Sequence, residues 1–331
     1  MELVAEIGPA NGDLGYALEA VHAAAESGFQ AVKGQVFHRD MLVTPTAKTY
    51  AQEGITTPDT QYEDFEAQLS YDEWEKVQAE CESAGLDFFF SAFDKGAVHF
   101  GEAIGVKRYK IASGDLTYKQ LHQRIAETGK EVVVSTGAAT GPEIVRALSW
   151  HDGPVTLLAC TLSYPCEPRF ANLRRMEALR DLVKGDPFGI SVGYSDHTYG
   201  TDAIVRAEEL GAVMVEKHFT ITPGEGGDHD FAVTPQQMRA YWDHKNDWRG
   251  TSVYDGDGLL SPSHAEQRAL YGARRSMHAG RDLLEGNVLG ANHVKMLRPA
   301  AGIEPWRLDD YVGRPLQRSV AAGQPITEEC F

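Results

Sequence analysis

Residues 189–219 of the chain read GISVGYSDHTYGTDAIVRAEELGAVMVEKHF. The stretch begins and ends with short runs typical of buried strands, Gly189–Ser195 and Val213–Phe219. Between them, the apolar residues of Thr201–Leu210 recur at the spacing of one face of a helix. A strand, a helix and a strand in this order predict two parallel strands joined by a crossover helix, the repeating unit of α/β proteins.

The same alternation continues toward the N-terminus. Six further strand-like runs precede this unit, with helical patterns or turns between them: Leu3–Ile7, Ala31–Phe37, Asp87–Phe93, Arg108–Ala112, Glu131–Thr136 and Val155–Thr161. Eight such units predict an α/β fold, a (β/α)8 TIM barrel. A doubly wound open sheet is the alternative, but no glycine-rich nucleotide-binding fingerprint follows the first run. The long segment Phe37–Gln68, rich in Thr, Pro and Asp, is a predicted loop of the kind that shapes substrate sites.

A change in the pattern of strand-like and helical runs near residue 250 predicts the domain organisation. Gln236–Trp248 is the last predicted helix of a catalytic barrel that spans residues 1–250. A stretch rich in Gly, Asp and Ser and a short helix around Ala265–Tyr271 form a predicted linker over residues 251–273. Residues 274–331 alternate short runs and turns, which predicts a small second domain. The length of 331 residues suits one barrel of about 250 residues plus such a module.

The composition limits the partners and the compartment. A formal net charge of −17 disfavours nucleic acid, and an anionic metabolite would need a local basic pocket. There is no run of about 18 apolar residues that would predict a membrane span, and the N-terminus lacks the pattern of a signal peptide. The four cysteines form no CxxC pair, which indicates reduced thiols. We therefore expect a cytoplasmic protein.

Two histidines at neighbouring strand ends indicate a metal site. His197 follows the seventh predicted strand and His218 ends the eighth, so adjacent barrel strands bring them within reach of one ion. Glu216 lies two residues before His218 and points to the same face of its strand. Two imidazoles with oxygen ligands and open positions suit a divalent ion such as manganese or magnesium better than zinc.

Two lysines at strand ends predict an anion site. Lys33 and Lys110 end the second and fourth strands, and an inward lysine is costly unless it is paired with an anion. Hydroxyl groups at other strand ends would add hydrogen-bond donors to a phosphate: Ser113, Ser135 and Ser195. The alternative is that each lysine pairs with a nearby acid such as Glu6 or Glu216.

Several motifs together resemble the N-acetylneuraminate (sialic acid) synthase family. They occur in family order: Ala5-Glu6-Ile7-Gly8, Val32-Lys33-Gly34-Gln35, Tyr109-Lys110-Ile111-Ala112-Ser113-Gly114-Asp115, Ser135-Thr136-Gly137, Cys160-Thr161 with Tyr164-Pro165, Gly193-Tyr194-Ser195-Asp196-His197-Thr198 and Glu216-Lys217-His218-Phe219-Thr220. Residues 274–331, with Arg298-Pro299 and Gly302-Ile303, resemble the antifreeze-like (SAF) domain of that family. The resemblance covers nearly the whole chain.

The resemblance implies an enzyme that condenses phosphoenolpyruvate with a sugar aldehyde. It implies a divalent metal on His197 and His218, manganese first, with magnesium or cobalt as alternatives. Glu6, Lys110 and Asp228 would be catalytic, and the implied substrate-binding residues are Lys33, Gln35, Ser113, Asp115, Ser135, Tyr164, Ser195 and Arg298. Arg298 would reach into the barrel of a partner subunit in a domain-swapped homodimer.

Departures from the family pattern leave the acceptor open. The stretch Pro9-Ala10-Asn11-Gly12 lacks the usual histidine, Ala159 stands where a histidine is expected, Leu162 replaces a polar residue, and Gly226-Gly227-Asp228 lacks a proline. The expected acceptor is N-acetylmannosamine or a related amino-sugar aldehyde, and a different aldehyde is the alternative. Two other functions are compatible with the residues: a metal-dependent aldolase or hydrolase, and a binding protein without catalysis.

Overall fold

The computed structural model describes residues 1–52, 55, 57–245 and 247–331. Residues 53, 54 and 56 of the predicted loop and residue 246 of the predicted last helix lie outside the described residues. Eight parallel strands close into a barrel in the order β1 to β8, so the predicted (β/α)8 fold is confirmed. The strands are β1 Glu2–Glu6, β2 Ala31–Val36, β3 Asp87–Ala92, β4 Arg108–Ile111, β5 Glu131–Ser135, β6 Val155–Cys160, β7 Ser191–Asp196 and β8 Met214–His218.

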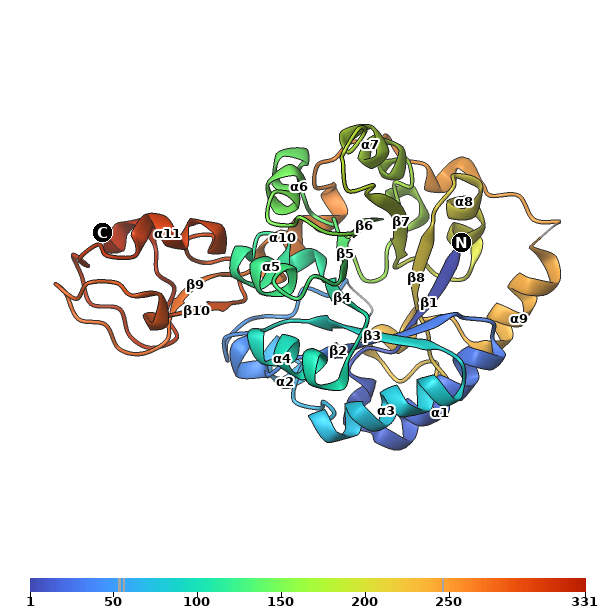
Figure 1. Cartoon of the computed structure of the whole chain (residues 1–331), viewed down its shortest axis with the longest axis horizontal. Coiled ribbons are helices and arrows are strands. Elements are labelled where there is room, and N and C mark those ends of the chain that lie inside the picture. The colour runs from blue at the N-terminus through green and yellow to red at the C-terminus, as the bar shows by residue number, and fades with distance from the viewer. Residues whose placement is uncertain (53–54, 56, 246) are drawn as a thin grey trace.

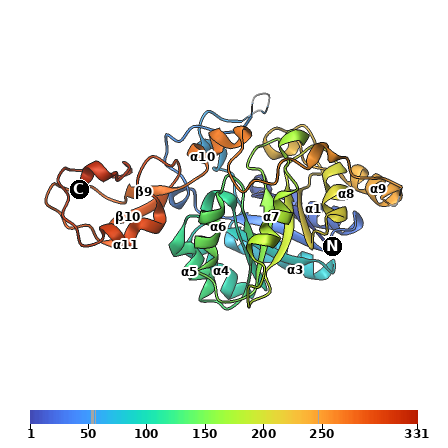
Figure 2. The same cartoon turned by 90° about the horizontal axis from the view of Figure 1, so that it is seen from above.

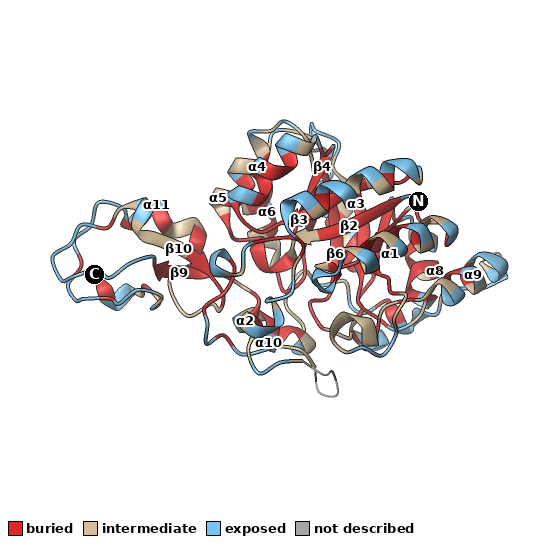
Figure 3. Cartoon of the chain, turned by 90° about the horizontal axis from the view of Figure 1, so that it is seen from below, coloured by how far each residue is buried: buried red, intermediate tan, exposed pale blue. Residues whose placement is uncertain are grey.

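Helices surround the barrel, with their apolar faces buried against the strands and their polar faces toward water (Figures 1 and 3). They are α1 Leu14–Glu26, α3 Tyr71–Ser83, α4 Lys95–Ile104, α5 Lys119–Ala126, α6 Gly141–Leu148, α7 Arg175–Leu182, α8 Asp202–Glu209 and α9 Pro235–His244. Several begin with a hydroxyl side chain that accepts a backbone N–H, as Ser70 does for α3 and Thr140 for α6. None of the described helices is long and apolar enough to cross a membrane.

The side chains inside the barrel form two levels. The lower level is apolar and closes the barrel: Val4, Ala31, Phe89, Val133, Leu158 and Met214. Two residues further along their strands, the same inward direction is taken by polar side chains, including Glu6 after Val4 and Glu216 after Met214. The period of two in a strand therefore places the polar level at the carboxyl ends of the strands, where barrel enzymes have their sites.

The loop after β2 and the linker cover one side of this carboxyl end. The loop contains α2 Gln61–Asp64, and the linker contains α10 Gln267–Gly272. The Gln61 amide donates hydrogen bonds to the carbonyl oxygens of Lys48 (3.0 Å) and Gly272 (2.9 Å), so it ties α2 to α10. Figure 2 shows α10 next to the loop, between the barrel and the C-terminal domain.

The C-terminal domain contains a two-stranded antiparallel sheet, β9 Ser276–Ala279 and β10 Val294–Leu297, and the short helix α11 Leu308–Tyr311. It projects from one side of the barrel (Figure 1). Residue 298 joins it to the barrel, because the Arg298 N–H donates to the Leu42 carbonyl (3.0 Å) and the Arg298 carbonyl accepts from the Thr44 N–H (2.9 Å). The four cysteines are buried and free.

Candidate active site

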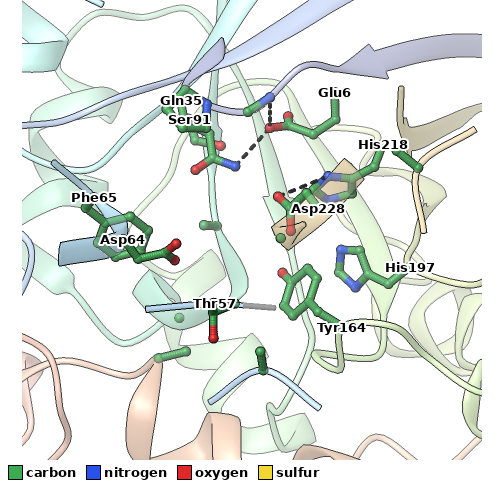
Figure 4. A pocket seen from close by; sticks show the side chains of 18 of the residues that line it. Glu6, Gln35, Thr57, Asp64, Phe65, Ser91, Tyr164, His197, His218 and Asp228 are labelled. Carbon is green, nitrogen blue, oxygen red and sulfur yellow. Dashed lines mark hydrogen bonds and ion pairs between the residues drawn. The ribbon is translucent and has the colours of Figure 1, made fainter. Parts of the chain in front are cut away.

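A cavity of about 680 Å³ opens at the carboxyl ends of the barrel strands. Twelve of the thirteen site residues predicted from the sequence line it: Glu6, Lys33, Gln35, Lys110, Ser113, Ser135, Tyr164, Ser195, His197, His218, Asp228 and Arg298. They come from nearly all the βα loops and strand ends and from the C-terminal domain. Figure 4 shows several of their side chains converging on one space.

The floor of the cavity holds two lysines and two glutamates. Lys33 Nζ lies 2.5 Å from Glu6 Oε2 and 3.4 Å from Glu216 Oε2. Lys110 Nζ lies 3.1 Å from Glu216 Oε2, and Ser195 donates a hydrogen bond to Glu216 Oε1 (2.9 Å). All four charged side chains are buried. Glu216 thus joins the two lysines, and both lysines pair with acids, as the alternative interpretation of the sequence held.

The pKa values of this group show two opposed effects. Burial lowers the pKa of Lys33 to about 7, because Glu216 offsets only part of the desolvation and Lys110 adds repulsion. Burial alone would raise the pKa of Glu216, but the nearby charges of Lys110 and Lys33 outweigh it and lower that pKa. Glu6 is further held in place by hydrogen bonds from the Gly8 N–H (2.9 Å) and the Gln35 amide (2.9 Å).

Hydroxyl groups border the floor. The Ser113 hydroxyl oxygen accepts a hydrogen bond from the Gly137 N–H (3.0 Å), which ties the loop after β4 to the loop after β5. The Ser135 Oγ atom is buried and has no hydrogen-bond partner among the described residues. Because buried polar atoms in proteins are normally satisfied, Ser135 is suited to bind a ligand atom.

The two histidines lie side by side, with ring centroids 5.4 Å apart. His197 Nδ1 is 2.9 Å from the Thr161 carbonyl oxygen, so this nitrogen carries the proton and Nε2 keeps a free lone pair. His218 Nδ1 lies 3.3 Å from Asp228 Oδ2. Burial lowers the pKa of His197 to about 4, which keeps the ring neutral, the form that binds metals. Two neutral imidazoles beside a carboxylate are the ligand types that a divalent cation takes. Among the described residues, however, no three His, Cys, Asp or Glu side chains are already arranged to hold an ion.

Asp115 differs from its prediction as a substrate-binding residue. Its carboxylate does not line the cavity and is fully buried in an ion pair with Arg275, the residue before β9. The short helical turn at Ser113–Asp115 explains the difference, because it turns Ser113 toward the cavity and Asp115 toward the C-terminal domain. Asp115 therefore joins the two domains.

Arg298 lines the cavity of its own chain in this structure, whereas the resemblance implies that it reaches into the barrel of a partner subunit. Its Nη1 is 3.4 Å from Gln61 Oε1, and its guanidinium lies 5.6 Å from the ring centroids of Phe65 and Phe93. The physical reason is the short path of the linker: α10 is bonded to α2, and Ala273 lies against Gly114 at the cavity wall. In the single chain the guanidinium therefore lies at its own cavity, and the exchange of domains between subunits stays a prediction.

The sequence departures divide into two groups. Pro9, Asn11, Leu162 and the glycines before Asp228 line the cavity, as expected for an altered acceptor site. Ala159 packs among the apolar residues between the barrel and its helices, because it alternates with the inward-facing Leu158. The missing histidine at position 159 therefore leaves the cavity unchanged.

Some residues at the cavity were not predicted as site residues. Glu216 was named from the sequence only as a neighbour of His218 and a possible partner of the lysines, and the structure places it at the centre of the floor. Gln61, Asp64 and Tyr50 lie in the loop after β2, where no strand period indicates which side chains point inward. Glu266 lies behind the site: its carboxylate accepts the N–H groups of Ala138 (2.6 Å) and Leu162 (2.9 Å). Nothing in its local sequence indicates this contact.

The closed parallel barrel and the charged cavity at its carboxyl end define an enzyme of the (β/α)8 class. Comparison with known proteins then identifies the family. The NeuB family model matches residues 20–249, and the SAF domain model matches residues 274–331. The chain belongs to the NeuB family and carries a SAF domain, and it is a synthase of the condensing transferase class.

The relatives include proteins named as acid synthases. The chain is 33% identical to the N,N'-diacetyllegionaminic acid synthase of Legionella pneumophila over 96% of this chain and 91% of the relative. It is 28% identical to the pseudaminic acid synthase of Helicobacter pylori, over 96% and 94%. A solved N-acetylneuraminic acid synthetase from Leptospira borgpetersenii matches with a TM-score of 0.63 at 26% identity, over 81% of this chain and 89% of that chain. The spore coat polysaccharide biosynthesis protein SpsE of Bacillus subtilis shares the fold, with a TM-score of 0.83 at 22% identity, over 99% and 94%.

Proposed function

We propose that the chain condenses phosphoenolpyruvate with the aldehyde of an amino sugar to give a nonulosonic acid and phosphate. One observation carries the proposal: Lys33 and Lys110 are buried side by side with Glu216 between them, next to the His197 and His218 pair. A small dianion or trianion would satisfy both lysines. The family membership and the names of the relatives support this reaction over an aldolase or hydrolase.

Three floor residues, Lys33, Lys110 and Glu6, act in the reaction together with Ser135 and Asp228. Lys33 and Lys110 bind the phosphate and carboxylate groups of phosphoenolpyruvate, and Ser135 donates to a phosphate oxygen. The methylene carbon of the donor forms a bond to the aldehyde carbon, and the aldehyde oxygen takes a proton from Asp228. Water adds to the carbon that bears the phosphate, and Glu6 accepts the proton of that water. The bond between this carbon and the phosphate oxygen then breaks, and Lys110 stabilises the departing phosphate.

His197 and His218 would hold a divalent cation, with Asp228 beside them. We propose manganese, with magnesium or cobalt as alternatives, because imidazole with oxygen ligands suits these ions. Such a cation supplies Lewis acidity toward an aldehyde oxygen when it is bound. The protein contribution is the orientation of the two rings, which the Thr161 carbonyl sets for His197.

The acceptor is proposed to carry two N-acetyl groups. Two relatives, at 33% and 30% identity, are named N,N'-diacetyllegionaminic acid synthases. Leu162, which is apolar and lines the cavity beside Tyr164, is compatible with an acceptor that differs from N-acetylmannosamine.

The test is a synthesis assay. Phosphate release from phosphoenolpyruvate is measured with manganese and two acceptors, N-acetylmannosamine and a hexose with two acetamido groups. We expect release that depends on the acceptor and on the metal, faster with the second sugar. If no amino-sugar aldehyde elicits phosphate release, the proposed reaction is wrong.

We further propose a homodimer in the cytoplasm. If the C-terminal domains are exchanged in that dimer, an Arg298→Ala chain mixed with a Lys110→Ala chain will regain activity, because one site of each mixed dimer has both residues. If Arg298 acts in its own barrel, as the single chain has it, the mixture will stay inactive.

A further inference from the structure

The cavity wall carries a carboxylate that the reaction above does not use, that of Asp64. Asp64 is the last residue of α2, and Figure 4 shows its side chain pointing into the cavity. The helix is fixed at its first turn, because the Thr60 side chain and the Glu63 side chain cap each other's backbone N–H groups. Gln61 anchors the same turn to the linker. The position of Asp64 is therefore set by the fold and not by a flexible surface loop.

The Asp64 carboxylate has no cationic partner within the part of the chain that is described. It makes no side-chain hydrogen bond or ion pair there. The residue stays exposed overall, and partial desolvation by the protein around it raises its pKa with no nearby positive charge to offset the effect. Arg298, the cation on the same wall, directs Nη1 to Gln61 and stacks near Phe65 and Phe93. A partly desolvated carboxylate without donors is stabilised when a ligand supplies them.

The two substrates differ in what they offer to such a group. Phosphoenolpyruvate is an anion that carries no hydrogen-bond donor when ionised, so Asp64 would repel it. An amino-sugar aldehyde carries hydroxyl groups and amide N–H groups, which are donors. Phosphoenolpyruvate and the aldehyde group of the sugar bind at the floor around Lys33 and Lys110. The part of the sugar beyond its aldehyde group therefore contacts the wall formed by α2.

We propose that Asp64 determines acceptor specificity by accepting a hydrogen bond from a hydroxyl or amide N–H group of the sugar. This inference depends on the proposed function, because it assigns one substrate to one wall of the same cavity. Phe65, next in the chain, also lines the cavity and offers an apolar surface for an N-acetyl methyl group. Asp64 and Phe65 thus offer a hydrogen-bond acceptor for an N–H group of the sugar beside an apolar surface for the methyl group of its N-acetyl substituent.

The test separates the two substrates kinetically. The sugar in this test is the one that the wild-type protein converts, N-acetylmannosamine or the diacetamido hexose. In Asp64→Ala we expect KM for this sugar to rise about 10- to 100-fold, since losing a hydrogen bond to a charged group weakens binding by about that factor. KM for phosphoenolpyruvate should stay within about twofold. Asp64→Asn, which keeps a neutral acceptor oxygen, should give an intermediate KM for the sugar, whereas a purely structural role would not follow this order.

Glu66→Gln is the matched control. Glu66 lies two residues away with a side chain 73% exposed, and it does not line the cavity. Its KM values should equal those of the wild type. The inference is overturned if Asp64→Ala leaves KM for the sugar unchanged or raises KM for phosphoenolpyruvate equally. Failure of the proposed function looks different: the wild-type protein itself would release no phosphate with either sugar.

Discussion

The carboxylate of Asp115 and the guanidinium of Arg275 form an ion pair that excludes solvent completely. The pair joins the loop after β4 to the residue that precedes the first strand of the SAF domain. Arg275 also donates hydrogen bonds to the carbonyl oxygens of Met41 (2.6 Å), Phe93 (2.7 Å) and Met296 (2.9 Å). One guanidinium thus connects two barrel loops and β10, and it depends on Asp115 for its counter-charge.

Asp115→Asn should therefore destabilise the protein without changing substrate binding. Removing one partner of a buried pair leaves an uncompensated charge and costs roughly 3–5 kcal/mol. Thermal and denaturant unfolding measure this loss. Asp309→Asn is the control, because Asp309 also links the two domains, through Lys119, but its side chain is 68% exposed. That pair contributes at most about 1 kcal/mol. Equal losses in the two variants would contradict the assignment, and so would a higher KM for phosphoenolpyruvate in Asp115→Asn at unchanged stability.

Phosphoenolpyruvate binding should weaken above neutral pH. The pKa of Lys33 is about 7 in the free protein, and a bound anion favours the charged ammonium. Binding therefore takes up a proton when the pH exceeds 7, so Kd should rise up to about tenfold per pH unit above that value. Calorimetric titration between pH 6.5 and 8.5 measures the slope. In Lys33→Arg the group stays protonated, and the slope should disappear even if affinity falls. A wild-type Kd that is constant above pH 7.5 would contradict this prediction.

A methyl group at position 137 should disturb the anion site. A Cβ on Gly137 would lie 2.8 Å from Ser113 Oγ and 3.1 Å from Leu162 Cβ, so Gly137→Ala forces the Ser113 hydroxyl out of place. Loss of one such hydrogen bond corresponds to about a fivefold weaker binding of phosphoenolpyruvate. Gly153→Ala is the control, since an added Cβ there meets nothing within 4 Å. The shift in the midpoint of thermal unfolding on addition of phosphoenolpyruvate measures binding in each variant. Equal shifts for Gly137→Ala and Gly153→Ala would refute the prediction.

Removing one imidazole should weaken manganese binding. His197→Ala should bind Mn²⁺ at least about tenfold more weakly, measured by the paramagnetic resonance signal of the free ion. His22→Ala, whose ring is 61% exposed on α1, should bind it normally. Treatment with a chelator should abolish turnover in the wild type, and added manganese should restore it. A His197→Ala protein with unchanged manganese affinity would show that the metal lies elsewhere.

The barrel and most of the site could be predicted because both depend on the strand period. Lys33 and Glu216 lie two residues after the apolar inward residues Ala31 and Met214, so the closed sheet brings them together wherever the loops go. Asp115 shows the limit of this reasoning: a helical turn of three residues after β4 directs Ser113 and Asp115 to different sides. A motif fixes the order of such residues but not the direction of each side chain.

Contacts between distant segments were beyond prediction for a different reason. Asp64 lies in a loop whose path depends on Gln61 meeting Gly272, more than 200 residues away. The position of Arg298 depends on the same linker, so its placement in its own barrel or in a partner's cannot be decided from a local pattern. These contacts arise from tertiary packing, which the periodicity of apolar residues along the sequence does not predict.

The Glu266 carboxylate, which binds the Ala138 and Leu162 N–H groups, belongs to a segment that neither matched family model includes, since residues 250–273 fall between them. Its second oxygen pairs with the buried Arg175, which also donates to the Cys160 carbonyl (2.8 Å) at the end of β6. A chain shortened to residues 1–249 would therefore retain every strand of the barrel. It would leave Arg175 without its counter-charge, and the Ala138 and Leu162 N–H groups at the cavity without their acceptor. In this protein, residues 250–273 between the two matched domains help to form the barrel's active site. A barrel domain bounded by the family match would lack them.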